Sequence, residues 1–296
     1  MTLQEHFERL RRSIADLKLG ERRFADVGRA GRGYADRAIA GLGRIDFGAL
    51  FSDLAVALSF YTRLPLRSAA PVDGAALARA AWCAPLVGVL IGVLAGLAYW
   101  IAYRLNLPPL VCAALAVAAG MLLTGCLHED GLADTADGLG GGETRERALD
   151  IMRDGRIGAY GACALVICLA LRIGALADLP RAALVAWALV GAHTAARAAL
   201  PLVMRLVPPA RADGLSASAG APSPGRAAAA AAIGIVCLWV ALGFRNALIA
   251  LVLLLIGAVV TAWLARRKIG GQTGDVLGAV EQVSETLVLL VTAARF

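Results

Sequence analysis

Long apolar runs separated by short polar connectors dominate the chain from about residue 82 onward. Each run approaches the length of about 20 residues that a helix needs to cross about 30 Å of hydrocarbon. The pattern therefore predicts an all-α fold, a polytopic integral membrane protein with six to seven transmembrane helices. The clear spans are 82–103, 110–127, 159–178, 182–204, 227–243 and 247–265.

Two further apolar stretches are less clear as spans. Residues 47–66 are interrupted by Asp53, Arg63 and Pro65, and we expect an interfacial or re-entrant segment there. Residues 283–294 are short for a span, so we interpret them as the end of a longer helix that begins near Asp275.

The first 46 residues are polar and lack the apolar core of a secretory signal peptide, which predicts a cytoplasmic N-terminus. Within them, a helical stripe is formed by apolar residues spaced three or four apart: Leu3, Phe7, Leu10, Ile14 and Leu17. We favour an amphipathic helix on the membrane surface; the alternative is a short coiled-coil contact with another subunit. The predicted domains are an extension, 1–46, and a transmembrane domain, 47–296.

Composition supports a membrane location for most of the chain. Of the residues, 59% are hydrophobic and 17% are charged, against roughly 25% charged in a soluble domain. The mean hydropathy of +0.71 excludes a disordered chain. Six cysteines stand singly in apolar runs, so we expect buried thiols and neither disulfides nor a zinc site.

The formal net charge is +7, and the basic residues follow the positive-inside rule. With the N-terminus inside, the connectors 128–158, 205–226 and 266–282 are rich in arginine or lysine. The outside turns carry one arginine each: Arg104, Arg181 and Arg245. We therefore expect these three connectors to face the cytoplasm of a prokaryotic inner membrane. The charge indicates membrane lipids as partners, and no nucleic acid motif accompanies it.

The connector 128–158 holds eight of the 22 acidic residues. If its first part is helical, Asp130, Asp134 and Asp137 fall within an arc of roughly 60° on one face, because each residue advances about 100°. No basic residue occurs between His128 and Thr144 to relieve their repulsion. Carboxylate ligands without cysteine suit Mg²⁺, with Mn²⁺ as an alternative.

A second pair of acids, Asp150 and Asp154, repeats the spacing of four and has Arg153 and Arg156 beside it. Between the two acidic groups, Gly140, Gly141 and Gly142 offer amides that a phosphate can approach, although the glycines also suit a simple turn. The loop as a whole predicts metal-assisted phosphoryl chemistry at the membrane surface.

Polar residues inside other spans point to the same end of the protein. His193 and Arg197 lie four apart in the span 182–204, and we expect both to face inward. Arg197 is suited to hold a phosphate, whereas His193 fits a ligand contact and a structural hydrogen bond equally well. Gln272 and Asp275 follow two glycines at a helix start, where Asp275 either caps the helix or contacts substrate or metal.

These residues resemble the cobalamin synthase family, the adenosylcobinamide-GDP ribazoletransferases, from about residue 50 to the end. The resemblance rests on the stretches Phe60–Pro65, Pro85–Gly88, Leu123–Gly158, Arg197 and Gly270–Glu285. One departure is Glu129, where the family pattern leads us to expect an apolar residue. That departure makes the role of His128 less certain.

The resemblance implies a Mg²⁺-dependent transfer that joins adenosylcobinamide-GDP to α-ribazole, or to its 5′-phosphate, and releases GMP. The implied metal ligands are Asp130, Asp134 and Asp137, with a second ion on Asp150 and Asp154. Candidate phosphate ligands are Arg153, Arg156 and Arg197, and either His128 or an unliganded carboxylate accepts the proton. The sequence leaves open the number of ions, the base and whether the protein is a homo-oligomer.

Two other functions compete with this one. A CDP-alcohol phosphotransferase also clusters aspartates on membrane helices, but the expected Ala-Arg pair is replaced here by Leu139 and three glycines. A cation-coupled transporter would place its acids near mid-span and use inverted repeats, and we find no convincing repeat.

Overall fold

The computed structural model describes residues 46–65 and 73–294, and its regular elements there are helices. This confirms the all-α prediction for the described residues. The chain divides into two compact units, Met1–Leu50 and Phe51–Phe296. The fold below is that of the second unit. The predicted amphipathic helix in residues 1–46 lies outside the described residues, apart from Asp46.

Among residues 46–65 and 73–294, five helices are long and apolar enough to cross a membrane, and a sixth span results if the bent pair α5 and α6 counts as one. The elements in chain order are α2 (Phe47–Tyr61), α3 (Gly74–Ala80), η1 (Ala81–Cys83), α4 (Ala84–Arg104), α5 (Pro109–Thr124), α6 (Leu127–Gly141), α7 (Arg145–Ile151), α8 (Ala159–Ala177), α9 (Ala182–Leu206), α10 (Leu215–Ala219), α11 (Pro224–Ile269) and α12 (Gly274–Ala293).

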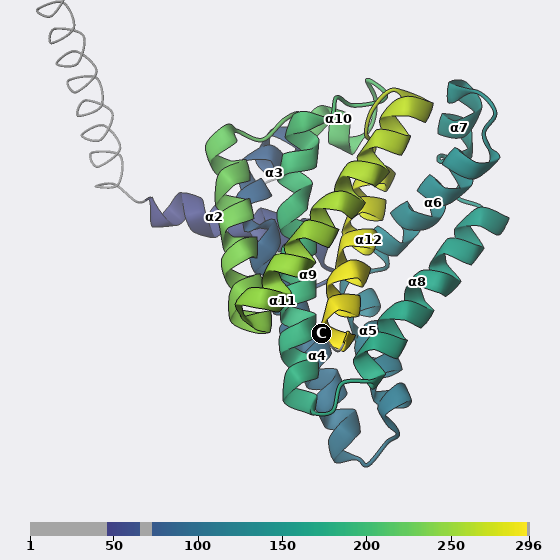
Figure 1. The fold of residues 1–296 in the computed structure, drawn as a ribbon. Coiled ribbons are helices and arrows are strands. Elements are labelled where there is room, and N and C mark those ends of the chain that lie inside the picture. Colours follow the sequence, from purple (N-terminus) through teal and green to yellow (C-terminus); the bar gives the residue numbers. More distant parts are fainter. Residues whose placement is uncertain (1–45, 66–72, 295–296) are drawn as a thin grey trace, which may run out of the picture. The chain divides into compact units, whose positions relative to one another are not determined.

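Helix α11 contains both of the spans predicted at 227–243 and 247–265. Its regular backbone is broken at Gly243, where φ is 72°, a left-handed value that glycine adopts without strain. The two arms, 224–242 and 244–269, meet at this break, and both outer ends of the helix lie at the upper end of the unit (Figure 1).

The other uncertain segments are also resolved as helices. Helix α12 begins at Gly274, which confirms that the apolar stretch 283–294 ends a longer helix. Helix α2 has 15 residues and is shorter than the helices that could span a membrane. Asp53, which interrupts its apolar sequence, accepts a hydrogen bond of 2.9 Å from the indole nitrogen of Trp82.

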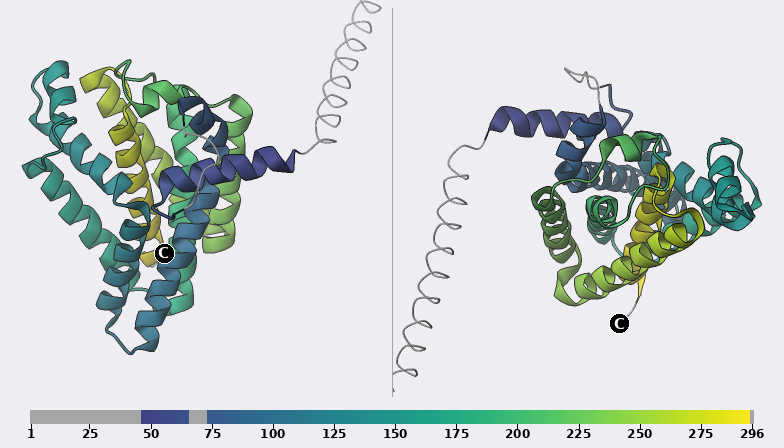
Figure 2. Two further views of the ribbon diagram at one scale, coloured as in Figure 1. Left: turned by 180° about the vertical axis from the view of Figure 1, so that it is seen from behind. Right: turned by 90° about the horizontal axis from the view of Figure 1, so that it is seen from above.

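Helix α12 occupies a central position and packs against α6, α8, α9 and α11 (Figures 1 and 2). Apolar side chains fill the core between these helices, including Leu189, Leu254 and Leu289. Other apolar side chains, such as Val166 and Val259, are exposed on the outside. An apolar exterior is what helices need when lipid, and not water, surrounds them.

The six cysteines are all free, as predicted, but they are not all buried. Cys83, Cys112 and Cys168 lie in the core, whereas Cys126 and Cys163 are exposed. The expectation of burial was wrong for these two because an apolar run in this protein does not imply a position inside the bundle.

A sharp turn joins α5 to α6, whose axes differ by 91°. Gly125 and Cys126 both have left-handed backbones at this turn, with φ of 66° and 59°. A Cβ atom on Gly125 would lie only 2.2 Å from Nε of Arg63, and the backbone amide of Arg63 donates to the carbonyl of Leu123 at 2.7 Å. The segment after α2 therefore packs directly on the turn that sets the direction of α6.

Helices α6 and α12 approach each other closely at two glycines. A Cβ atom on Gly131 would lie 2.8 Å from the carbonyl oxygen of Asp275 and 3.1 Å from Cα of Gly278. Any larger residue at this crossing requires the helices to separate, because backbone atoms and not flexible side chains are in the way. The crossing places the acidic face of α6 beside the start of α12.

Candidate active site

A cavity of about 200 Å³ lies between α2, α3, α6, α9, α10 and α12. Its polar lining comes from His128 and Asp130 of α6, Ser216 of α10 and Asp275 of α12. The rest of the lining is mainly apolar and comes largely from α2, α3 and α9. The cavity thus combines carboxylates with apolar walls, as small-molecule sites do.

The carboxylates of Asp130 and Asp275 line this cavity, and both are near enough to Asp134 for their charges to act on it. Helix α6 is regular from Leu127 to Gly141, as the acidic spacing required. Asp130 is exposed and Asp134 is partly exposed, and the charges of Asp130, Asp275 and Asp137 all act on Asp134. Within the described ranges, neither Asp130 nor Asp134 forms an ion pair; Arg211 lies 4.0 Å from Asp275. This concentration of negative charge favours a cation.

Asp137 has a different environment from the other two aspartates of α6. It is buried, and its two carboxylate oxygens accept backbone amides of Gly158 at 2.7 Å and Gly161 at 2.9 Å. These amides belong to the start of α8, whose first turn has no partners within the helix. Asp137 therefore joins α6 to the N-terminus of α8.

The second acidic pair lies on and after α7 and does not line the cavity. Asp150 is exposed. Asp154 accepts two hydrogen bonds from Arg156, at 2.9 and 2.7 Å, which lower the pKa of its carboxyl below the ordinary value. Arg153 pairs with Asp213 at 2.5 Å and so connects α7 to the segment before α10.

The three glycines proposed as phosphate ligands complete the end of α6 and are not an open loop. Gly140 and Gly141 are helical, and Gly142 donates its amide to the carbonyl of Gly138 at 3.1 Å. A Cβ atom on Gly140 would contact the ring of Tyr160 at 2.7 Å, and one on Gly142 the backbone of Ala148 at 2.5 Å. Close packing against α7 and α8 thus accounts for small residues at these two positions.

A cluster of buried charges lies beside the cavity. Arg172 of α8 is 1% exposed and contacts Glu129 of α6 at 3.3 Å. It also forms an ion pair with Glu285 of α12 and donates to the side-chain oxygen of Gln282 at 2.7 Å. Arg172, which stands inside an apolar run of the sequence, therefore pairs with acids on α6 and α12.

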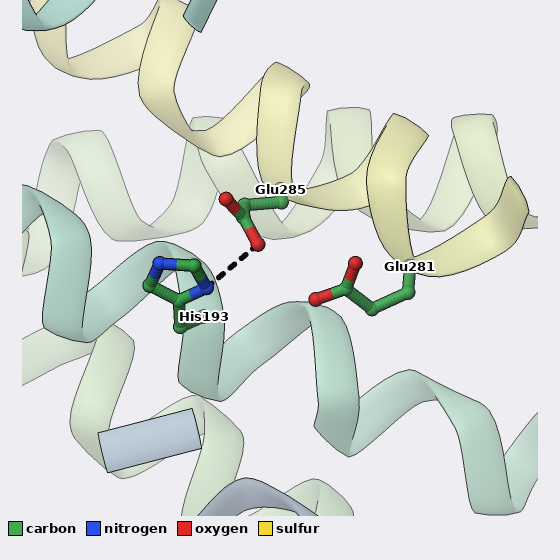
Figure 3. Close-up of side chains that lie close together, drawn as sticks. All are labelled: His193, Glu281 and Glu285. Carbon is green, nitrogen blue, oxygen red and sulfur yellow. Dashed lines mark ion pairs between the residues drawn. The ribbon is translucent and has the colours of Figure 1, made fainter. Parts of the chain in front are cut away.

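The same cluster continues to α9. His193 lies 2.7 Å from Glu285 (Figure 3). Arg197 lies 2.6 Å from Glu281. Arg197 also donates to Nδ1 of His128, at 3.2 Å. Both α9 residues thus face inward, as predicted, but neither lines the cavity.

In the part of the chain that the structure describes, possible metal-ligand atoms come within 4.8 Å of one another in one group of three residues: His193, Glu281 and Glu285. A divalent cation there would sit beside Arg197 and near Arg172, which already neutralise the two glutamates. Such a site would replace attraction with repulsion between positive charges. The geometry therefore describes an ion-pair core, not a metal centre.

Sequence reasoning assigned no role to Glu129, Arg172 or Gln282 and noted Glu281 and Glu285 only as part of a polar segment. The available signal was two acids spaced four apart in an apolar helix, together with an arginine inside another apolar run. Glu129, the departure from the family pattern, is explained by its contact with Arg172.

The segment between α9 and α10 is attached to the turn before α12. The backbones of Pro209 and Gln272 form a short parallel bridge, and the hydroxyl of Ser216 donates to the side chain of Gln272 at 2.6 Å. Gln272 is buried, so its side chain holds α10 over the cavity and does not line it. Arg145 adds a hydrogen bond of 2.9 Å to the carbonyl of Ile269.

The fold and the cavity define an all-α, multi-pass membrane protein with a carboxylate-lined site. Residues 53–293 match the family model for cobalamin-5-phosphate synthase. The chain belongs to this family.

Curated relatives carry a consistent name. A protein of Bradyrhizobium diazoefficiens named adenosylcobinamide-GDP ribazoletransferase is 56% identical over 246 residues, which cover 83% of this chain and 94% of that protein. Proteins of the same name from Mesorhizobium japonicum and Azorhizobium caulinodans are each 48% identical and cover 82% and 81% of this chain, and 93% and 95% of their own lengths. No solved structure matches the chain.

Proposed function

We propose that this protein joins adenosylcobinamide-GDP to a ribazole acceptor and releases GMP. The names of its relatives support the reaction, and the carboxylate-lined cavity is the structural observation that carries it. Family membership favours this function over the CDP-alcohol phosphotransferase and transporter alternatives.

The reaction breaks the phosphoanhydride bond of the diphosphate and forms a phosphoester bond. An acceptor hydroxyl oxygen attacks the phosphorus attached to cobinamide, and the bond from that phosphorus to the bridging oxygen of the diphosphate breaks. GMP leaves with the bridging oxygen, while the hydroxyl proton passes to a base. The candidates for this base are His128, which lines the cavity, and a carboxylate of the site that holds no metal.

We propose that Mg²⁺ is the cofactor and that Asp130, Asp134 and Asp275 hold it. All donors are carboxylate oxygens, and the first two lack ion pairs among the described residues, so the donor set fits a hard divalent cation. When bound, Mg²⁺ neutralises charge on the diphosphate and on the departing GMP. Asp137 supports this arrangement indirectly by fixing α6 against α8.

Arg197 is assigned a positioning role in this proposal. Its guanidinium is occupied by Glu281 and by His128, so it fixes the His128 ring beside the cavity and does not hold a phosphate. Arg211, 4.0 Å from Asp275, is the basic side chain closest to the proposed metal ligands among the described ion pairs.

We further propose that the site faces the cytoplasm of the inner membrane. The connectors 128–158 and 266–282 are rich in basic residues. Helix α7 and the end of α11, which belong to these connectors or adjoin them, lie at the upper end of the unit in Figure 1. Lys and Arg accumulate in cytoplasmic connectors.

The test is GMP release by purified protein in liposomes supplied with adenosylcobinamide-GDP and α-ribazole, with and without Mg²⁺. We expect release only when both substrates and the metal are present. Asp134→Asn should lower turnover at least 100-fold with unchanged thermal unfolding, because one metal-ligand oxygen charge is lost. Asp150→Asn, on the exposed part of α7, is the matched comparison. Full activity of Asp134→Asn at limiting Mg²⁺ would contradict the ligand assignment.

A further inference from the structure

We propose that the aromatic base of the ribazole acceptor binds against the apolar lining residues of α2, α3 and α9, which we call the apolar half of the cavity. This inference rests on the proposed function and adds to it the orientation of one substrate. It gives the apolar lining residues of α2, α3 and α9 a role in substrate binding, whereas the proposed metal site uses only the acidic residues.

The walls of this half have the chemistry of an aromatic binding site. Phe60 and Tyr61 of α2 contribute rings whose centroids lie 4.8 Å apart at 74°. Leu77 of α3 and Leu200 and Met204 of α9 complete the lining. Flat heterocycles gain contact energy from aromatic and aliphatic side chains of this kind.

The size of the cavity selects among the parts of the two substrates. At about 200 Å³, it is smaller than the roughly 300–1,000 Å³ of pockets that enclose whole small-molecule ligands. A benzimidazole has two fused rings, as the side chain of Trp does, whereas a corrin macrocycle is several times larger. The cavity therefore accommodates the base and leaves the corrin outside.

The distribution of polarity fixes the orientation of the acceptor. The diphosphate and the ribose are polar or charged and would lose hydration against Leu77, Leu200 and Met204. The benzimidazole is the least polar part of either substrate. With the base among these side chains, the ribose extends toward Asp130 and Asp275, where the reacting hydroxyl is needed.

Guanine is the other flat ring system in the reaction, and it fits this half less well. Its edge carries an amide and an amino group that need hydrogen-bond partners when buried. Hydrogen-bond donors and acceptors are absent from the side chains of Phe60, Leu77 and Leu200, and the thioether of Met204 is only a weak acceptor. Tyr61 supplies one hydroxyl.

Steady-state kinetics with cavity-filling variants test the assignment. We expect Leu200→Trp and Leu77→Trp to raise KM for α-ribazole at least tenfold and to change KM for adenosylcobinamide-GDP less than twofold. Leu255→Trp is the matched control, because Leu255 is 46% exposed on the outside of α11. A rise in KM for adenosylcobinamide-GDP instead of α-ribazole would assign the cavity to the other substrate and overturn the proposal.

A size series of acceptors distinguishes loss of space from loss of folding. Leu200→Trp should recover activity with a riboside of unsubstituted benzimidazole more than with the dimethyl form, whereas a misfolded variant recovers with neither. Equilibrium dialysis of radiolabelled α-ribazole provides a readout that needs no turnover: wild type should bind and Leu200→Trp should bind at least tenfold more weakly. Equal binding by both proteins overturns the proposal, whether or not GMP is released. Absence of GMP release by wild type contradicts only the proposed function.

Discussion

Arg172 and Arg197 are each 1% exposed, and each contacts glutamates that arrive from another helix. A buried charge without a partner is far more costly than a buried pair, because its hydration is lost with nothing to replace it. The residues of this cluster therefore act as a set that fixes α6, α8, α9 and α12 relative to one another. His128 contacts the same set and lines the cavity, so the cluster also positions one side of the site.

Removing Arg172 should be much more destructive than removing one of its partners. We expect Arg172→Met to destabilise the protein by about 3–5 kcal/mol, because Glu129 and Glu285 both lose their ion pair with Arg172. Glu129→Gln should cost about 1 kcal/mol, since Arg172 keeps Glu285 and Gln282. Thermal unfolding in detergent measures both.

Arg153→Met is the control for the loss of an arginine. Its pair with Asp213 is exposed and should contribute about 0–1 kcal/mol. Equal stability of the Arg172 and Arg153 variants would show that the buried cluster does not hold the helices.

Among the elements, the crossing of α6 and α12 decides whether the acids of the two helices meet. Periodicity predicted each helix and the shared face of Asp130 and Asp134, because those follow from local spacing. Glu129 and Arg172 contact each other although they are more than 40 residues apart in the chain. Local spacing carries no information about such contacts. Likewise, the acidic pattern alone did not separate Asp137, a cap for α8, from Asp130 and Asp134.

Enlarging Gly131 should separate the two helices. We expect Gly131→Ala to reduce kcat at least tenfold and to lower the unfolding temperature, because its Cβ would lie 2.8 Å from the carbonyl of Asp275. Gly174→Ala in α8 is the matched control, since nothing lies within 4 Å of a Cβ there. That change should leave activity intact and stabilise the helix by about 0.5–1 kcal/mol. Equal activity of the two variants would contradict a role for the crossing.

At the scale of the whole molecule, the hydropathy pattern predicted the membrane class and most span positions. It treated 227–243 and 247–265 as separate spans, and the structure joins them through the break at Gly243. It did not predict the 91° bend between α5 and α6, because that depends on left-handed backbones at Gly125 and Cys126. The cavity was also beyond prediction, since seven elements line it: six α-helices and η1.

Cysteine labelling tests the proposed orientation. In a background with Cys126 and Cys163 replaced by alanine, Asn106→Cys should react with a membrane-impermeant maleimide in intact spheroplasts. Asp213→Cys should react only after lysis, because the basic connectors are expected inside. Both positions are exposed, so access to the side chain is not limiting. Labelling of both from the same side would contradict the arrangement.

The order in which the buried charges emerge from the ribosome has a consequence for biogenesis. Arg197 is synthesised in α9, but the acids that pair with it, Glu281 and Glu285, both belong to α12 at the end of the chain. Until that last helix arrives, the nascent protein carries an uncompensated guanidinium in an apolar segment, an unfavourable state. Entry of α12 is therefore the step that neutralises Arg197, and chains that terminate before it should be cleared by membrane quality-control proteases.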